Sequence, residues 1–223
     1  MKARRNDSIE KTRGLSSLIN LINTLKNSGV GKLVALRVEE FKSNRRKASA
    51  EIFKELCFCI LTANFSAEKA IKIQMEINDG FLSLSEADLT EKLKALGHRH
   101  PNSRAKYIVE ARKMIPEIEK VLNSSMDEKA LREWLVKNIK GLGYKEASHF
   151  LRNIGFMNVS IVDFHIINLL LRYGLIEKKP KNMTKRRYIE IEKKLIELSK
   201  TVGLSLGELD LYLWFIETGK ILK

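Results

Sequence analysis

Lys145 and Asp163 are the two residues whose types and spacing point most directly to chemistry. Lys145 follows a Gly141-Leu142-Gly143 turn, and Asp163 lies eighteen residues further along the chain. A Gly-x-Gly turn that opens a helix presents backbone N–H groups to a phosphate. The positive end of the helix dipole and partial burial both favour a neutral, nucleophilic amine at Lys145. A carboxylate at Asp163 could take up a proton or stabilise a developing cation.

The chain between these two residues is long enough to bring them together. The sequence predicts a helix from Tyr144 to about Ile154 that ends at Gly155 and carries the chain about 15 Å away. The eight residues 155–162 can span about 26 Å when extended, so Asp163 can return to Lys145. Asp163 is also a favoured N-cap for the apolar run that follows. Each residue alone has a structural explanation, as a helix cap or a surface lysine, and only the pair indicates catalysis.

The composition describes a basic globular chain. Its 223 residues include 41 Lys and Arg against 27 Asp and Glu, a net charge of +14, and 44% are hydrophobic. That apolar content is enough for one large domain or two small ones. A soluble protein this basic usually binds a polyanion, most often nucleic acid, although a general solubility surplus is the alternative. The densest basic runs are residues 42–47 and 178–187.

Neither a metal site nor a membrane span is expected. Cys57 and Cys59 are the only cysteines, and on a helix they point about 200° apart, so they are expected to be core residues without a mutual disulfide. They cannot hold an iron–sulfur cluster unaided, and no histidine cluster suggests zinc. No run of about 18 apolar residues is present. The sequence therefore indicates a cytoplasmic protein.

Helical periodicity runs through nearly every segment, which predicts an all-α fold of about ten to twelve helices. Ser85 and Ser205 each begin a capping box, Thr184 is an N-cap for a long amphipathic helix, and Pro116 interrupts another helix. Two helical lobes are expected. The central lobe covers about 48–135, and the N-terminal helices with the chain after about 140 form the other.

The segment at about 130–154 resembles a helix-hairpin-helix motif, which binds DNA phosphates through backbone amides. With Lys145 and Asp163 it resembles the helix-hairpin-helix DNA glycosylase superfamily, and the lysine matches its bifunctional members, which are glycosylases and AP lyases. Residues 53–65, 96–99 and 208–214 resemble the archaeal-type 8-oxoguanine DNA glycosylase/AP lyase subfamily. The similarity covers about residues 30 to 223, which divides the chain into an N-terminal extension or helix (1–30) and a two-lobed glycosylase region (31–223).

This resemblance implies a reaction. The damaged nucleotide is flipped out of the duplex, because its C1′ atom cannot be reached inside the stack. Lys145 attacks C1′, expels the oxidised base and forms a Schiff base, while Asp163 stabilises oxocarbenium character, and β-elimination then nicks the strand. The implied partner is double-stranded DNA containing an oxidised base, in a monomeric, nucleoid-associated enzyme. No metal or organic cofactor is required, and a monovalent cation at the hairpin is an optional ligand.

The resemblance also suggests further site residues, each with a structural alternative. The expected DNA-binding residues are the hairpin residues Lys140, Gly141 and Gly143 together with Asn64, His98 and Arg99. Asn64 could instead be a helix cap, and the His98 cluster could simply lie on the surface. The expected base-recognition residues are Asp210, Trp214 and Lys223. Trp214 could instead belong to the core, and residues added after Lys223 are expected to weaken excision. His149 and His165 are expected to be satisfied histidines on apolar helices.

Two other functions remain open from the sequence. A lyase of the same mechanism could act on oxidised pyrimidines, and a non-catalytic helix-hairpin-helix protein could bind DNA without cleaving it. The second gives no reason for both Lys145 and Asp163. An RNA-binding helical protein is disfavoured because no RNA-binding module is recognisable. The preferred lesion, the role of the opposite base and any δ-elimination are not determined by the sequence.

Overall fold

A computed structural model describes residues 14–223 of the chain, and every regular element in that part is an α-helix. The all-α prediction is confirmed. The described part contains thirteen helices, slightly more than expected, because one of them is the single turn α5 (Gly80–Ser83). The first thirteen residues of the predicted N-terminal extension lie outside the described residues.

The first group of helices packs around α3, whose residues Phe53 to Thr62 are all buried. A helix that is buried on every side must carry apolar residues on every side, and Phe58, Cys59 and Ile60 are fully inaccessible. Both cysteines are free thiols in this core, and burial raises their pKa well above the usual value. Helix α3 spans Ser49–Thr62. The other helices of the group are α4 (Ala67–Ile77), α5, α6 (Glu86–Ala95), α7 (Pro101–Arg112), α8 (Ile115–Leu122), α9 (Glu128–Asn138) and α10 (Tyr144–Asn153).

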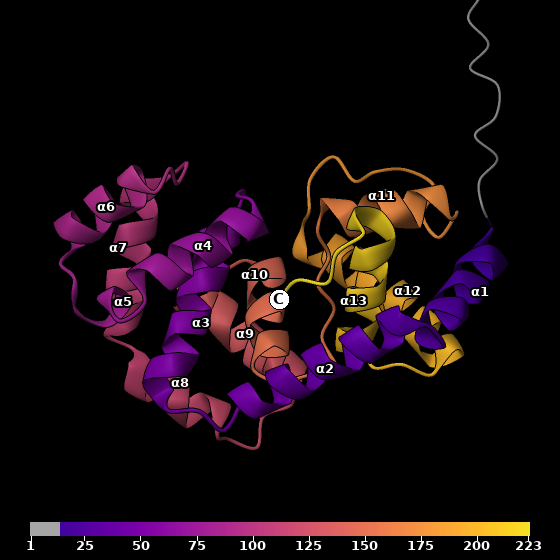
Figure 1. Ribbon diagram of the computed structural model, residues 1–223, viewed down its shortest axis with the longest axis horizontal. Coiled ribbons are helices and arrows are strands. Elements are labelled where there is room, and N and C mark those ends of the chain that lie inside the picture. The colour runs from indigo at the N-terminus through magenta and orange to yellow at the C-terminus, as the bar shows by residue number, and fades with distance from the viewer. Residues whose placement is uncertain (1–13) are drawn as a thin grey trace, which may run out of the picture.

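The second group has its own core, built from both ends of the chain. Leu18 and Ile22 of α1 are fully buried in one core with Leu170 and Leu195, which follow them by more than a hundred residues. Figure 1 shows α2 running along the lower side of the molecule and joining the two groups. The helices of the second group are α1 (Leu15–Lys26), α2 (Gly29–Asn44), α11 (Phe164–Arg172), α12 (Lys185–Val202) and α13 (Leu206–Thr218).

The local signals mark these boundaries as predicted, except that Ser85 forms a side-chain cap and not a full capping box, because the Asp88 carboxylate accepts a hydrogen bond from the Ser85 hydroxyl. The hydroxyls of Ser85, Thr184 and Ser205 accept N–H groups in the first turns of α6, α12 and α13. Pro116 lies in the first turn of α8, where a missing N–H costs nothing. Helix α12 is amphipathic, and its buried face includes Tyr188 and Glu192, while Ile189 and Ile196 at its edge are half-buried.

Helix α10 ends where the sequence predicts, and the chain then turns back. Ile154 is the C-cap, and Gly155 has a φ of +90°. A Cβ atom at Gly155 would lie 2.9 Å from the Cα of Lys42 on α2, so only glycine fits this turn. The extended residues that follow lead to Asp163, the N-cap of α11.

Candidate active site

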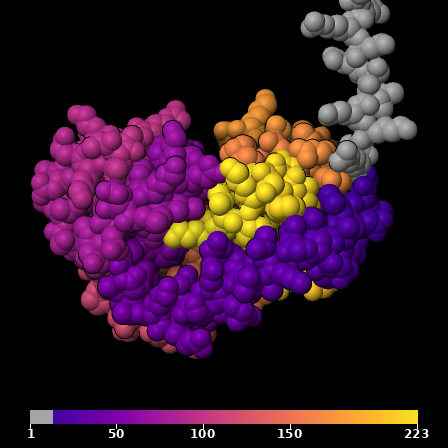
Figure 2. Space-filling view, in the orientation of Figure 1, coloured from indigo at the N-terminus to yellow at the C-terminus, as the bar shows by residue number. Residues whose placement is uncertain are grey.

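A cleft of about 1020 Å³ lies where α10, α11 and α13 meet the junction of α3 and α4. Figure 2 shows the C-terminal segment (yellow) extending across the molecule toward the first group of helices. Seven of the predicted site residues line this cleft: Asn64, Arg99, Lys145, Asp163, Asp210, Trp214 and Lys223. Segments far apart in the sequence therefore contribute to one concave surface.

Lys145 is the second residue of α10, and its side chain is one-quarter exposed. Its Nζ lies 3.2 Å from a carboxylate oxygen of Glu146 and 3.5 Å from the carbonyl oxygen of Thr62. The other Glu146 oxygen accepts the N–H of Gly143 at 3.1 Å, which closes the turn before the helix. Glu146 was not among the predicted site residues. The sequence feature that could have identified it is an acidic residue at the third position of a helix, where the carboxylate can accept the N–H of the N-cap residue.

Asp163 faces the same cleft from the start of α11. Its side chain accepts the N–H of Ile166 at 2.9 Å, as predicted for an N-cap. Burial raises the pKa of this carboxyl, and the Ile166 N–H and electrostatic interactions with His165 and Lys145 partly oppose that increase. Burial of this kind favours a carboxyl that exchanges a proton closer to neutral pH than an exposed aspartate does.

The hairpin turn lies beside the cleft. Gly141 has a φ of +89°, and a Cβ atom there would lie 2.6 Å from the ring of Tyr107. Gly143 is the N-cap of α10 and is exposed. The Lys140 ammonium is exposed and lies 3.2 Å from the Glu110 carboxylate. The turn therefore presents backbone and a lysine to solvent beside Lys145.

Asp210 is buried within the cleft wall. One of its oxygens accepts a hydrogen bond from Arg152 at 2.5 Å, and both side chains are almost inaccessible. Burial raises the pKa of Asp210 to about 6, with a further contribution from Asp163, although Arg152 acts in the opposite direction. The predicted acceptor for a purine edge is thus a carboxylate already held by a buried cation. Sequence reasoning missed Arg152, whose only signal is a charge on the apolar part of α10.

Lys223 reaches the opposite side of the cleft. Its Nζ lies 2.9 Å from the Glu55 carboxylate, contacts the amide oxygen of Gln74 and sits 4.6 Å from the centre of the Phe58 ring. The other Glu55 oxygen accepts a hydrogen bond from Asn153 at 2.6 Å. Glu55 was also missed, although a lone carboxylate inside the apolar run of α3 is a recognisable signal for a buried partner.

Aromatic side chains form another part of the cleft wall. Trp214 is half-buried and lines the cleft, and its indole Nε1 is buried without a hydrogen-bond partner among the described residues. The ring centres of His165 and Phe164 are 3.8 Å apart with their planes tilted by 35°, and the His165 ring meets Trp214 edge-on with the ring centres 4.6 Å apart. Phe164 remains two-thirds exposed. His149 also lines the cleft, where burial lowers its pKa well below the usual value.

The prediction that His98 faces a phosphate is wrong. His98 is buried, its Nε2 lies 3.0 Å from the Leu61 carbonyl oxygen, and its Nδ1 accepts the N–H of His100. These contacts require the neutral imidazole with its proton on Nε2, and burial lowers the pKa of His98 accordingly. Arg104, which follows shortly after this cluster, donates to the carbonyl oxygen of Ala63 at 2.6 Å. Arg99 is the cationic member of the cluster that remains exposed.

Two further findings concern the whole described chain. No helix within residues 14–223 combines the length and apolar character needed to span a membrane. Over the same residues, no group of three or more His, Cys, Asp or Glu side chains is arranged to hold a metal ion.

An all-helical fold with a helix-hairpin-helix turn, and with a lysine and an aspartate sharing one cleft, defines a helix-hairpin-helix DNA glycosylase. A family model described as 8-oxoguanine DNA glycosylase matches residues 34–204, and the chain belongs to that family.

Several relatives are similar over most of their length. The chain is 56% identical to an 8-oxoguanine DNA glycosylase/AP lyase of Korarchaeum cryptofilum, covering 94% of this chain and all of the relative. A crystal structure of the Methanocaldococcus jannaschii 8-oxoguanine glycosylase/lyase, in complex with a 15mer DNA containing 8-oxoguanine, superposes with a TM-score of 0.90 at 51% identity. That match covers 92% of this chain and 99% of the other. The Thermotoga maritima 8-oxoguanine DNA glycosylase gives a TM-score of 0.88 at 41% identity over 94% of this chain and all of that one.

Proposed function

We propose that this protein is a bifunctional DNA repair enzyme that excises 8-oxoguanine and then cleaves the DNA strand at the abasic site. The observation that carries the proposal is the shared cleft of Lys145 and Asp163 beside the hairpin turn. The names of the curated relatives support both activities, and the M. jannaschii complex supports 8-oxoguanine as the lesion. Non-catalytic DNA binding would not require this pair of residues.

The proposed reaction begins with the damaged nucleotide flipped into the cleft. The amine of Lys145 attacks C1′, and the bond to the base breaks with its electron pair leaving on the base. Asp163 stabilises the cationic character that develops at the sugar and accepts a proton from the amine. Opening of the sugar ring gives a Schiff base between Lys145 and C1′. Loss of a proton from C2′ and departure of the 3′-phosphate then cleave the strand by β-elimination.

DNA is proposed to lie across the hairpin and the mouth of the cleft. The backbone of Gly141 and Gly143 and the ammonium of Lys140 would contact phosphates. Arg99 would add a further phosphate contact from the opposite rim. Asn64 is exposed at the cleft, with a left-handed φ of 57° that Asn tolerates better than most residues. We propose that its amide fills the space left by the flipped nucleotide and hydrogen-bonds the estranged base.

The base itself is proposed to be bound by Asp210, Trp214 and Lys223. The exposed part of the Trp214 ring offers a surface for stacking, and the Asp210 oxygen that does not bind Arg152 offers an acceptor for the purine edge. Lys223 is held against Glu55 where it would meet the flipped base. The ion pairs of Asp210 and Lys223 support fixed positions for both residues.

The remaining expectations are part of the same proposal. The enzyme would act as a monomer on double-stranded DNA, in the cytoplasm and associated with the nucleoid, without a required cofactor. Backbone carbonyl oxygens at the hairpin are the type of ligand that binds monovalent cations. A cation site there is tested by comparing the affinity for DNA in potassium salt with the affinity in tetramethylammonium salt. We also retain the division into an extension (1–30) and a two-lobed region (31–223), with a central lobe of about 48–135 and the hairpin motif at about 130–154.

Borohydride trapping on duplex DNA with one 8-oxoguanine opposite cytosine tests the function. The wild-type protein is expected to form a covalent adduct, whereas the Lys145→Gln variant, which keeps a polar side chain but has no amine, forms none and still binds the duplex. An adduct on thymine glycol but not on 8-oxoguanine would instead identify a lyase for oxidised pyrimidines. Binding without trapping on either lesion would identify a non-catalytic DNA-binding protein.

A further inference from the structure

The hydroxyl of Tyr188 fixes the backbone immediately before Asp163. Tyr188 lies on α12 and is fully buried, with 1% of its surface exposed. Its hydroxyl donates a hydrogen bond to the carbonyl oxygen of Ser160 at 2.6 Å and accepts one from the N–H of Val162 at 3.2 Å. These are backbone groups of the extended segment that brings Asp163 back to the cleft, so Tyr188 replaces the hydrogen bonds that a regular element would supply.

The same hydroxyl lies against the start of α10, which carries Lys145. The carbonyl oxygen of Tyr144, the residue before Lys145, is 3.3 Å from the Tyr188 hydroxyl. The hydroxyl of Ser148, one turn further along α10, is also 3.3 Å away. A single hydroxyl therefore contacts the backbone next to Lys145 and the backbone next to Asp163.

A buried ion pair holds the surroundings of Tyr188 in place. Arg132 of α9 and Glu192 of α12 form two parallel hydrogen bonds of 2.6 Å and 2.8 Å, and both side chains are almost completely inaccessible. The guanidinium lies against both the Tyr144 and the Tyr188 ring, at 5.3 Å and 5.4 Å from their centres, and those centres are 5.4 Å apart. One Glu192 oxygen also accepts the N–H of Ser160 at 3.1 Å. Bidentate geometry of this kind fixes orientation as well as distance.

We propose that Tyr188 is a positioning residue for the glycosylase reaction, setting the distance between Lys145 and Asp163 through the two backbone segments that its hydroxyl joins. This inference rests on the proposed function, because it assigns importance to the relative placement of those two residues. Tyr188 itself does not line the cleft and so does not touch the substrate. Its effect is therefore on catalysis rather than on DNA binding.

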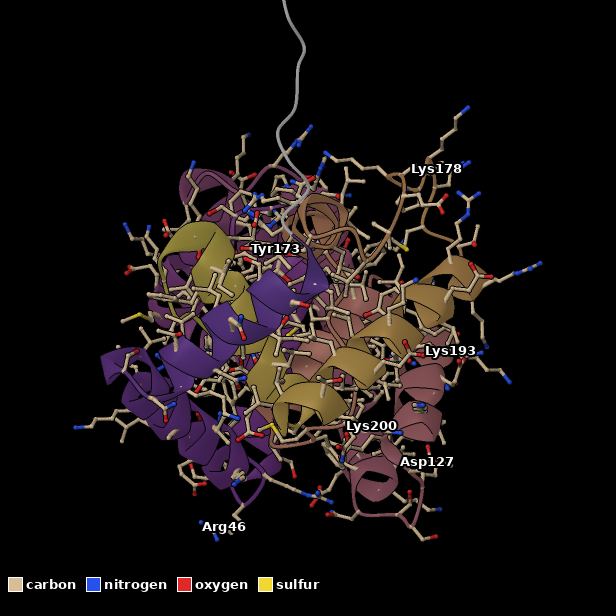
Figure 3. All side chains as sticks on the ribbon, turned by 90° about the vertical axis from the view of Figure 1, so that its right-hand side faces the viewer. Arg46, Asp127, Tyr173, Lys178, Lys193 and Lys200 are labelled. Carbon is tan, nitrogen blue, oxygen red and sulfur yellow. The ribbon has the colours of Figure 1, made fainter. Side chains whose placement is uncertain are left out.

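Removal of this hydroxyl alone is the appropriate test. The Tyr188→Phe variant keeps the ring and its packing but leaves the Val162 N–H without its acceptor. A matched control is Tyr173→Phe, since Tyr173 is 2% exposed in the same core, and its hydroxyl forms no hydrogen bond with the other described residues. Tyr173 is labelled among the side chains of Figure 3. Ser148→Ala removes a neighbouring hydroxyl and provides a milder second variant if Tyr188→Phe folds poorly.

The measurements separate positioning from general loss of structure. Single-turnover excision of 8-oxoguanine should fall at least roughly tenfold in Tyr188→Phe, since misplacement of reacting groups by about 1 Å can cost a factor of 100. The affinity of Tyr188→Phe for undamaged duplex DNA should stay within about twofold of the wild-type affinity, because the lost interaction affects the transition state and not ground-state binding. Schiff-base trapping on a preformed abasic site should fall less than excision, because its aldehyde reacts with Lys145 without departure of a base. Tyr173→Phe should match the wild type in all three assays.

The outcomes distinguish a failure of the positioning role from a failure of the proposed function. An excision rate for folded Tyr188→Phe within twofold of the wild type would overturn the positioning role while leaving the proposed function intact. Equal losses in excision, trapping and DNA affinity would also overturn it, since they would indicate general damage to the fold. A wild-type protein inactive on 8-oxoguanine duplex would overturn the proposed function and this inference with it.

Discussion

Asp163 has to serve as a helix cap and as a catalytic group at once, and its two oxygens allow both. Oδ1 accepts the N–H of Ile166, and the carboxylate still faces the cleft that contains Lys145. Burial raises its pKa, so the carboxyl takes up a proton at a higher pH than an exposed aspartate, whose pKa is about 3.9. Burial therefore improves Asp163 as a proton acceptor, although the Ile166 N–H that completes the first turn of α11 acts in the opposite direction.

Replacement of Asp163 by asparagine tests this account through pH. Excision by the wild type should fall as pH decreases through the raised pKa of Asp163, because the ionised carboxylate is the active form. The Asp163→Asn variant should be roughly 100-fold slower or more at pH 7.5, and its residual rate should lack that acidic decrease. Single-turnover rates between pH 4.5 and 8.5 measure both effects. An unchanged acidic decrease in the variant would assign it to another group.

The stability of the same variant provides the control. Asparagine is as good an N-cap as aspartate, so the start of α11 should remain intact. A carboxyl whose pKa is raised by folding contributes stability at pH values below its unfolded pKa, and this contribution is lost as pH rises through the folded pKa. At pH 7.5 the Asp163→Asn protein should therefore unfold at the same temperature as the wild type or above it. A large loss of stability would make its low activity uninformative.

At the scale of elements, the hairpin turn depends on one glycine for two separate reasons. Gly141 has a left-handed φ of +89°, and a Cβ atom there would also meet the ring of Tyr107 at 2.6 Å. Gly174 has a similar φ of +72° but has open space where its Cβ would lie. Comparing alanine substitutions at Gly141 and Gly174 therefore distinguishes the cost of backbone strain from the cost of the contact with Tyr107.

Alanine at each position should give different results. Gly174→Ala should lose about 1–2 kcal/mol of unfolding free energy from the left-handed conformation alone and bind DNA normally. Gly141→Ala should lose more, because the Tyr107 ring must also move, and it should bind duplex DNA more weakly because the turn that contacts phosphates shifts. Urea unfolding and fluorescence anisotropy measure the two quantities. Equal DNA affinities for the two variants would show that the turn does not contact DNA.

The elements themselves were predictable because their signals are local. The caps at Ser85, Thr184 and Ser205, the break at Pro116 and the return of the chain to Asp163 all follow from neighbouring residues. The sequence also indicated seven of the residues that line the cleft, because their types and spacing resemble a known family.

Partnerships between distant segments were not predictable in this way. Arg132 and Glu192 are sixty residues apart in the sequence, and Arg152 and Asp210 are fifty-eight apart. The residues that flank each arginine do not identify its carboxylate partner. His98 was misjudged for a related reason. Next to Arg99 and His100 it resembles a surface cluster, and only the packing of α3 against this loop supplies the Leu61 carbonyl that buries it.

At the scale of the whole molecule, the net charge of +14 leaves open whether DNA affinity comes from the overall field or from particular lysines. Lys178, Lys179 and Lys181 are exposed in the connection between α11 and α12. Lys193, Lys194 and Lys200 are equally exposed on α12. Figure 3 places Lys178 at the upper end of the molecule and Lys200 toward the lower end. In Figure 1, α11, which begins at the cleft, also lies near the upper end.

Two triple variants with the same change of charge decide between these explanations. Replacing Lys178, Lys179 and Lys181 with glutamine lowers the net charge by three, and so does the same replacement at Lys193, Lys194 and Lys200. We expect the first variant to lose more affinity, because each phosphate contact removed reduces the slope of log K against log salt by about 0.9. The second should keep the wild-type slope and lose only a small, salt-screened part of its association rate. Binding to undamaged duplex at several salt concentrations measures both quantities. Equal slopes for the two variants would mean that the 178–181 lysines act only through the net charge, and the DNA surface would then be limited to the hairpin and the rim of the cleft.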